Sequence, residues 1–329
     1  MNRKYKLARW IGHRYWLRGR GRLVSLLCPP NGRTGEEFEV DFFAHRYRGR
    51  LDDFIDRHVY LNGGWEMHIL ALMSQLARVS REVTQRPVAY VDVGANTGQH
   101  VLFMSRHAES AICFEPFEPV RRRLEQRLAD NDLHNVKVMP IALSAQAGIQ
   151  LYYPPQGDNQ GTGSLISDFS ALVANRPDPI EVRTDLGDDC AALQSSPRMT
   201  ILKIDVEGGE RRVLEGLRKT LHRCRPAIVI ELSQYTRDDI GSLDRLYTLL
   251  YPDAVVFTVE QTAWRRGYNL RKCDFSAPSD ILVLPSELVA KVPRSASFAI
   301  ARAGSEQPTE HSGFGHQGSK PIANANVSR

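Results

Sequence analysis

The sequence has no apolar run close to the ~18 residues that a membrane-spanning helix needs. Its first residues are rich in positive charge and lack an apolar stretch followed by a small-residue cleavage site, so they do not predict a secretory signal. The five cysteines are scattered along the chain without a C-x-x-C pair, which is typical of reduced thiols and not of a disulfide framework or a zinc site. These absences predict a cytoplasmic protein.

Several catalytic signatures are also missing. The chain has no H-E-x-x-H zinc motif and no G-x-S-x-G nucleophile elbow, so we expect neither a bound metal nor a serine nucleophile. It has no G-x-x-x-x-G-K-[ST] loop for a triphosphate and no G-x-G-x-x-G fingerprint for a dinucleotide.

The length of 329 residues and the 42% of hydrophobic residues allow one large α/β domain with extensions. We predict a basic, aromatic-containing arm and linker over residues 1–35, and a cover of a hairpin plus a helix over 36–85. The main domain is expected over 86–290, and the polar composition of 303–329 predicts a disordered tail. The net charge of +5 is too mild to predict a nucleic-acid partner.

Acidic residues are absent from the first 35 positions, where basic and aromatic residues alternate. Over residues 1–23 this pattern predicts a helix that lies peripherally on an anionic membrane, at its cytoplasmic face. A solvated basic arm, or an arm packed on the domain, is the alternative. The basic residues are Arg3, Lys4, Lys6, Arg9, Arg14, Arg18, Arg20 and Arg22.

The stretch from Val88 to Glu115 has the layout of a nucleotide-binding β-α-β unit, in which a glycine loop joins an apolar run to a helix. Gly94 and Gly98 let the backbone pass close to a ligand. Glu115 ends the second apolar run, where a carboxylate can accept hydrogen bonds from both ribose hydroxyls. With Asp92 before the loop and no dinucleotide fingerprint, we expect a ligand with a ribose but no phosphate, namely S-adenosylmethionine.

Further apolar runs alternate with helical patterns through the main domain. This alternation predicts a doubly wound, mostly parallel sheet with helices on both faces, and the last two strands are expected to pair antiparallel at one edge. The predicted strands after the β-α-β unit are 136–143, 148–153, 201–205, 227–230, 254–259 and 280–284. The Pro- and Gly-rich stretch 154–163 is expected to be a functional loop.

Acidic residues follow the predicted strands repeatedly. The carboxyl ends of parallel strands meet at one edge of a sheet, where ligands bind, so these acids are expected to converge. Their mutual repulsion then needs a compensating cation, which the sulfonium and ammonium of S-adenosylmethionine supply. The acids are Asp92, Glu115, Asp205, Glu207 and Glu231. Glu66, at the start of a predicted helix, is interpreted as an acid that complements the helix dipole.

Five segments then carry a resemblance to a known family. Val91–Gly98 (VDVGANTG), Phe114–Pro116 (FEP), Ala142–Ser144 (ALS), Leu202–Gly208 (LKIDVEG) and Pro226–Glu231 (PAIVIE) occur in order at suitable spacings. Together they resemble the FkbM family of S-adenosylmethionine-dependent methyltransferases over roughly residues 60–235. The run Val182–Leu186 departs from the family pattern, which leaves the start of the next helix undefined.

The resemblance implies a class I methyltransferase fold and O-methylation of a sugar, glycan or polyketide-type hydroxyl. It also implies roles for particular residues. Asp92, Gly94, Asn96 and Gly98 would hold the methionine end of the donor, Glu115 the ribose, and the Ile141–Ala142 region would flank the adenine. Asp205 and Glu207 would face the transferred methyl group and the acceptor, and Asp205 would also contact the donor.

A neutral hydroxyl must lose its proton, so a base is expected beside the acceptor. Asp205 is the first candidate, followed by Glu207 and then His100, while Ser164 is a candidate for the acceptor wall. The turn Asp205–Gly208 (DVEG) replaces the Asn-Pro-Pro-Tyr-like turn of DNA-base and glutamine N-methyltransferases. Two alternatives stay open: an RNA or protein methyltransferase recruited by the basic arm, and a non-catalytic, membrane-associated binding module.

Overall fold

The computed structural model describes residues 2–29, 35–157, 159–167, 177–195, 198–262 and 266–298. The predicted tail at 303–329 and part of the predicted linker therefore lie outside the described residues. Arm, cover and main domain belong to one unit, Met1–Phe298. No helix among the described residues is both long enough and apolar enough to cross a membrane.

The chain begins with α1 (Arg3–Gly12) and α2 (Arg20–Leu27), which precede a hairpin. Strands β1 (Glu37–Phe42) and β2 (His45–Arg50) pair antiparallel, as their alternation predicted. Helices α3 (Phe54–Asn62) and α4 (Met67–Thr84) follow. The predicted helix of the cover corresponds to α4, whose apolar residues Ile69, Met73 and Leu76 are buried.

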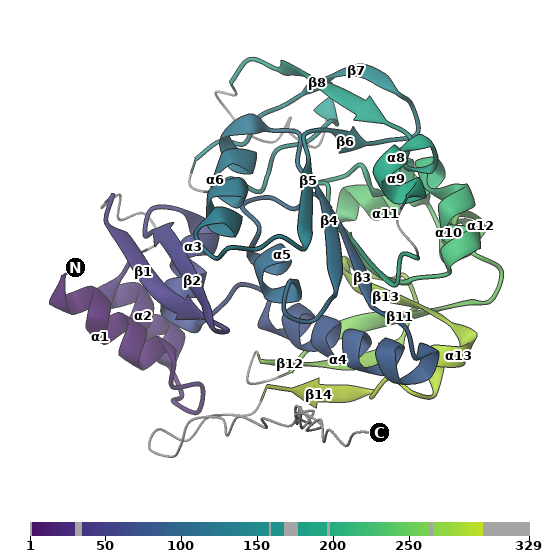
Figure 1. The fold of residues 1–329 in the computed structure, drawn as a ribbon. Helices are drawn as coiled ribbons and strands as arrows, with labels where there is room; N and C mark the ends of the chain where they lie inside the picture. Colours follow the sequence, from purple (N-terminus) through teal and green to yellow (C-terminus); the bar gives the residue numbers. More distant parts are fainter. Residues whose placement is uncertain are drawn as a thin grey trace, which may run out of the picture. The chain divides into compact units, whose positions relative to one another are not determined.

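The described residues of the main domain form a nine-stranded sheet, in the order β14-β12-β11-β13-β10-β9-β3-β4-β5 (Figure 1). Its central strands, from β10 to β5, run parallel. Their bounds are β3 Ala89–Val93, β4 Ser110–Phe114, β5 Val136–Met139, β9 Ile201–Ile204 and β10 Ala227–Leu232. The predicted fold class is confirmed in this section, where helices alternate with parallel strands.

The other half of the sheet is antiparallel. Strands β11 (Ala254–Gln261) and β13 (Ser279–Pro285) pair antiparallel, as predicted. Strands β12 (Gly267–Lys272) and β14 (Ser295–Ser297) were not predicted, and they extend the sheet beyond β11. The sheet is therefore mixed, with as many antiparallel as parallel pairings among the described strands.

The described residues of the main domain form the helices α5 Gln99–Met104, α6 Glu118–Ala129, α8 Ala191–Gln194, α9 Glu210–Gly216, α10 Arg218–Cys224, α11 Gln234–Ile240, α12 Leu243–Leu249 and α13 Ser286–Val289. A 3-10 turn at Gly187–Asp189 and α8 follow the run that departs from the family pattern. The helices bury two separate cores, because successive strand residues point to opposite faces. Ile201 lies in the core with α4 and α5, and Leu202 in the core with α9 and α10.

A second sheet of three strands corrects the prediction for residues 136–153. The predicted strand 136–143 splits at Pro140 into β5 of the large sheet and β6 (Ala142–Leu143) of the small one. Pro140 has no backbone N–H to donate to a strand ladder, so it interrupts the strand between β5 and β6. Strand β7 (Gly148–Tyr152) pairs with β8 (Ile180–Asp185), so it is an edge strand of the small sheet.

The N-terminal cover is joined to the main domain through the buried carboxylate of Asp56 on α3. Asp56 accepts hydrogen bonds from Arg127 at 2.5 Å and Arg123 at 2.6 Å, both on α6, and from the hydroxyl of Tyr47 at 2.8 Å. A buried carboxylate that binds two guanidinium groups of α6 holds the cover and the main domain in one geometry.

Candidate active site

The carboxyl ends of β3, β4, β9 and β10 open on one cavity. Strand register explains how distant acids meet there, because Ile204 pairs with Ile230, so the next residues along the two strands, Asp205 and Glu231, are also neighbours. The residues that line this cavity include Phe54, Ile55, Glu66, Gly94, Asn96, Glu115, Ala142, Ser164, Asp205, Glu207, Arg212 and Glu231. A smaller adjoining cavity is lined by Gly98, His100 and Lys203.

The loop after β3 passes directly over Asp205. Gly94 has φ +88°, and a Cβ at this position would collide with the backbone carbonyl of Asp205. Gly98, at φ +84°, immediately precedes α5, and a Cβ there would collide with Leu124 of α6. Both glycines are therefore required by close packing as well as by backbone conformation.

Glu115 lies at the end of β4, with its carboxylate held by the backbone. Its two oxygens accept hydrogen bonds from Asn96 N at 3.0 Å and Phe117 N at 2.9 Å. Burial raises the pKa of this carboxyl to about 7. Each carboxylate oxygen has a second lone pair, so the group can still accept hydrogen bonds from the two hydroxyls of a ribose. Ala142 lines the same cavity, on β6.

A buried lysine lies beneath the cavity. Lys203 is 4% exposed, and its Nζ is 2.7 Å from Asp205 Oδ2. Burial lowers the pKa of the Lys203 ammonium, but the carboxylates of Asp205 and Asp92 outweigh it and raise the pKa overall. Burial raises the pKa of Asp205, but the charge of Lys203 outweighs burial, so the pKa of Asp205 lies below its usual range. Lys203 and Asp205 are therefore both charged at neutral pH.

Asp92 is completely buried next to this pair and is not among the cavity-lining residues. Its Oδ2 accepts a hydrogen bond from the hydroxyl of Tyr90 at 2.8 Å, while its Oδ1 has no hydrogen-bond partner among the described residues. Burial raises the pKa of this carboxyl, and Lys203 opposes the increase. The site thus has an unsatisfied buried acceptor below the glycine loop.

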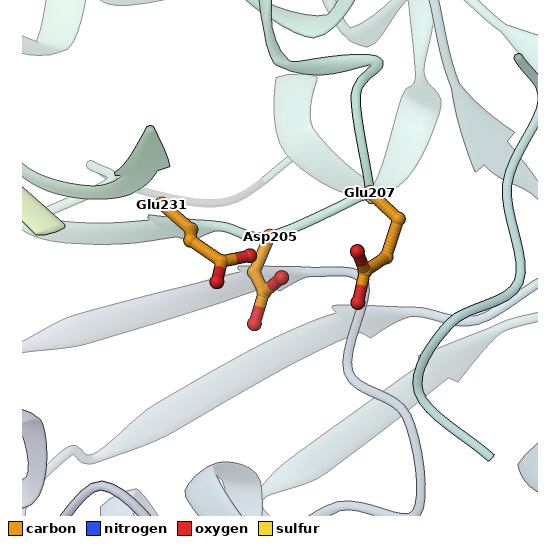
Figure 2. Close-up of side chains that lie close together, drawn as sticks. All are labelled: Asp205, Glu207 and Glu231. Atoms are coloured by element: carbon orange, nitrogen blue, oxygen red, sulfur yellow. The ribbon is translucent and has the colours of Figure 1, made fainter. Parts of the chain in front are cut away.

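Three carboxyl groups meet at the floor of the cavity (Figure 2). One oxygen each of Asp205, Glu207 and Glu231 lies within 4.8 Å of the others, with Asp205 between the two glutamates. The charge of Asp205, then burial, raises the pKa of Glu231 to about 11. Burial, then the charge of Asp205, raises the pKa of Glu207 to about 9. Such a cluster can hold protons, an organic cation or a metal ion, and the expectation of no metal stays a prediction.

Glu66 is a site residue that the sequence did not reveal. It precedes α4 in the left-handed conformation, at φ 48°, and its side chain lines the cavity. Its Oε2 is 3.4 Å from Nε2 of His100. Burial, then the charge of Asp280, raises the pKa of Glu66 to about 8. An acid near a helix start usually complements the helix dipole, so the sequence carried no signal for this position.

His100 and Ser164 lie beside the carboxyl cluster. Burial and the charge of Lys203 hold the pKa of His100 well below its usual range, so its imidazole is neutral. The hydroxyl of Ser164 donates a hydrogen bond to the backbone carbonyl of Glu207 at 2.6 Å. This bond supports Glu207 in the left-handed conformation, at φ 55°, which non-glycine residues adopt mainly where the surrounding structure enforces it.

The comparison with protein families identifies the "Methyltransferase FkbM domain" over residues 92–270. The chain is similar to Methyltransferase 1 of Beauveria bassiana, with 26% identity over 53% of this chain and 74% of the relative. It is also similar to the hexuronic acid methyltransferase AglP of Haloferax volcanii, with 26% identity over 50% of this chain and 64% of that protein.

A solved structure, methyltransferase FkbM from Methylobacillus flagellatus, has a TM-score of 0.40 and 15% identity to this chain. The match covers 62% of this chain and 47% of that one. The chain therefore spans less than two thirds of the length of AglP and about half of this solved relative. The family match includes every predicted donor-binding residue, from Asp92 to Asp205.

Proposed function

The chain belongs to the FkbM family of S-adenosylmethionine-dependent methyltransferases, and we propose that it methylates a hydroxyl group of an acidic sugar or glycan. The observation that carries the proposal is the carboxyl cluster of Asp205, Glu207 and Glu231 at the floor of the cavity. This cluster supports the proposal because carboxyl groups favour a positively charged donor and would supply a proton acceptor beside the transferred methyl group.

The residues fit the donor that the family implies. S-adenosylmethionine supplies an electrophilic methyl group on a positively charged sulfur. Gly94 lets the glycine loop lie against the backbone of Asp205 at the edge of the cavity, and the buried Asp92 below this loop has an Oδ1 without a hydrogen-bond partner among the described residues. Glu115 would bind the ribose hydroxyls and Ala142 would flank the adenine, while Gly94, Asn96 and Gly98 would surround the methionine end.

Among the carboxyl groups, Glu207 is better suited than Asp205 to take the proton of the acceptor hydroxyl. Asp205 is ion-paired with Lys203, which holds its pKa low and makes it a weak base. Glu207 forms no hydrogen bond through its carboxyl with the described residues, and its pKa near 9 falls toward neutrality when a cation binds beside it. Asp205, fixed by Lys203, then positions the reacting groups.

Arg212 supports an acidic acceptor. It lies on α9, lines the cavity and forms no ion pair with the described residues. The guanidinium of Arg212 is therefore available to bind an anionic group of the acceptor. A carboxylate on the acceptor would be held there by charge-assisted hydrogen bonds. The name of AglP states a hexuronic acid as its substrate, which is an acidic sugar of this kind.

The proposal is tested with methyl-labelled S-adenosylmethionine and a panel of neutral glycans, uronic-acid glycans, RNA and protein. We expect label in the uronic-acid glycans, on an ether oxygen. Arg212→Met should raise KM for the acidic acceptor by about 10–100-fold, while Arg218→Met, at an exposed position on α10, should leave it unchanged. Label found only in RNA or protein would overturn the proposal.

The same assay distinguishes methyl transfer from a second hypothesis, that the fold serves only as a binding module. This hypothesis predicts that S-adenosylmethionine binds but that no acceptor is labelled. The carboxyl of Glu207 favours a catalytic function over a binding module, because a protein that only binds the donor needs no base beside an acceptor.

A further inference from the structure

The first 29 residues expose large apolar side chains to solvent. Trp10 on α1 is 54% exposed, Trp16 in the turn after α1 is 60% exposed, and Leu26 on α2 is 79% exposed. Leu7 and Leu23 are also exposed. Single exposed apolar residues are common on the surfaces of soluble proteins, but a group of five within twenty positions marks an interaction site.

The same segment exposes positive charge that the protein does not neutralise. Five basic residues are exposed and form no ion pair with the described residues: Arg3, Lys4, Lys6, Arg18 and Arg22. No acidic residue occurs before Glu36. The surface therefore combines apolar side chains with a net positive field, and we refer to α1, α2 and the turn between them as the N-terminal platform.

The opposite side of the platform is fixed to α3. Gly12 packs so closely that a Cβ would collide with the carbonyl of Leu61. The hydroxyl of Tyr15 donates a hydrogen bond to the carbonyl of Asn62, and the guanidinium of Arg9 lies 5.3 Å from the ring centre of Tyr60. The platform is thus packed on the domain with one side and leaves its apolar and basic side chains on the other.

We propose that the N-terminal platform binds the surface of an anionic lipid membrane, with Trp10, Trp16 and Leu26 inserted among the lipids. Basic residues beside aromatic and aliphatic ones on short amphipathic helices match the chemistry of a headgroup interface. A nucleic acid would use the cations and could stack on the tryptophans, but it offers nothing to the exposed leucines. The exposed Leu7, Leu23 and Leu26 therefore favour lipid.

One connection between the platform and the catalytic cavity runs through α3. The contacts of the platform lie at Tyr60, Leu61 and Asn62 of α3, and Phe54 and Ile55 of the same helix line the cavity. Membrane binding would therefore hold the cavity at a fixed place relative to the lipid surface, where a glycan acceptor attached to lipid is presented. The inference concerns binding alone and does not depend on which hydroxyl is methylated.

The test is co-sedimentation of the full chain, without donor or acceptor, with vesicles of phosphatidylcholine alone or mixed with phosphatidylglycerol. We expect binding to the mixed vesicles only, decreasing as salt is added. The variant Lys4→Gln/Lys6→Gln/Arg18→Gln/Arg22→Gln should weaken binding by more than about tenfold. Trp10→Ser/Trp16→Ser/Leu26→Ser should weaken it comparably and remove any blue shift of tryptophan emission on binding.

The matched control is Ile149→Ser/Leu151→Ser, which removes two exposed apolar side chains of β7 outside the platform. It should bind vesicles as the wild type does, and circular dichroism should show that every variant is folded. Absence of vesicle binding by the wild type at low salt would overturn the proposal. The proposal would also be overturned if the two platform variants bound vesicles as well as the control variant does. Binding to RNA that survives the Trp/Leu replacements, without vesicle binding, would assign the surface to nucleic acid instead. None of these outcomes depends on methyl transfer.

Discussion

The ammonium of Lys203 lies 2.7 Å from the carboxylate of Asp205, two residues further along the chain. Residues two apart in an extended segment share a face, and the register of β9 against β3 brings Asp92 next to Lys203. The buried Lys203 therefore balances the charges of two carboxylates at once. This relationship makes a dense acidic site compatible with a folded protein.

The first prediction concerns that ion pair. Lys203→Met should lower the free energy of unfolding by about 3–5 kcal/mol, because it leaves buried carboxylates without a partner. Adding Asp205→Asn to the Lys203→Met variant should restore part of the loss, since one of those charges is removed. Urea denaturation at neutral pH measures both effects. Additive losses in the double variant would show that the two residues do not interact.

The second prediction concerns stability and pH without a donor. The pKa values of Glu231 and Glu207 are about 11 and about 9 in the folded chain, so the folded state keeps protons that the unfolded chain releases above about pH 4.3. The free energy of unfolding should therefore fall as pH rises from about 5 to about 9, by up to about 1.4 kcal/mol per pH unit for each group.

Glu231→Gln should remove part of that slope and stabilise the protein at about pH 8. The control Glu181→Gln replaces an exposed acid on β8 and should leave the slope unchanged. Thermal denaturation over this pH range is the measurement, and a stability that rises with pH would contradict the assigned pKa shifts.

The third prediction separates the two candidate bases. Glu207→Gln should lower kcat by about 10²–10⁴-fold, because the amide cannot accept the hydroxyl proton. It should also abolish the rise of kcat with pH that depends on an ionised Glu207. Asp205→Asn should change both kcat and the affinity for S-adenosylmethionine, since it disturbs the pair with Lys203. Retention of the pH dependence by Glu207→Gln would move the role of base to Asp205.

The fourth prediction concerns metal ions. Lys203 offsets the charge of Asp205, and the sulfonium of S-adenosylmethionine would offset the charge of Glu207 once that carboxyl ionises. Treatment with EDTA should therefore change the rate of methyl transfer by no more than about twofold. A larger loss that Mg²⁺ or Mn²⁺ restores would show that Asp205, Glu207 and Glu231 hold a divalent cation during the reaction.

Local signals explain what the sequence could predict. The loop from Gly94 to Gly98, the strand before it and the carboxylate of Glu115 lie within one short segment, so their arrangement follows from neighbouring residues. The meeting of Asp205 with Glu231 was also predictable, because parallel strands bring their carboxyl ends to one edge. The family resemblance assigned roles to these residues, and those roles stay predictions.

Other features depend on contacts that local patterns do not carry. Glu66 reaches the site only because α4, which it immediately precedes, packs against α5 and β9. Strands β12 and β14 lie at the antiparallel edge, where short polar segments pair only in the context of β11. The two faces of the N-terminal platform are likewise set by its packing on α3, so the sequence left the membrane-bound and domain-packed alternatives open.

The most direct test of the account is calorimetry of donor binding at about pH 8, in buffers of different ionisation enthalpy. S-adenosylmethionine carries the sulfonium charge that S-adenosylhomocysteine lacks, so only its binding should ionise Glu207. We predict that the wild type releases about one more proton with S-adenosylmethionine than with S-adenosylhomocysteine, and that Glu207→Gln abolishes the difference. Equal proton release with the two ligands, or the absence of binding by both, would contradict a cationic donor held by the carboxyl cluster.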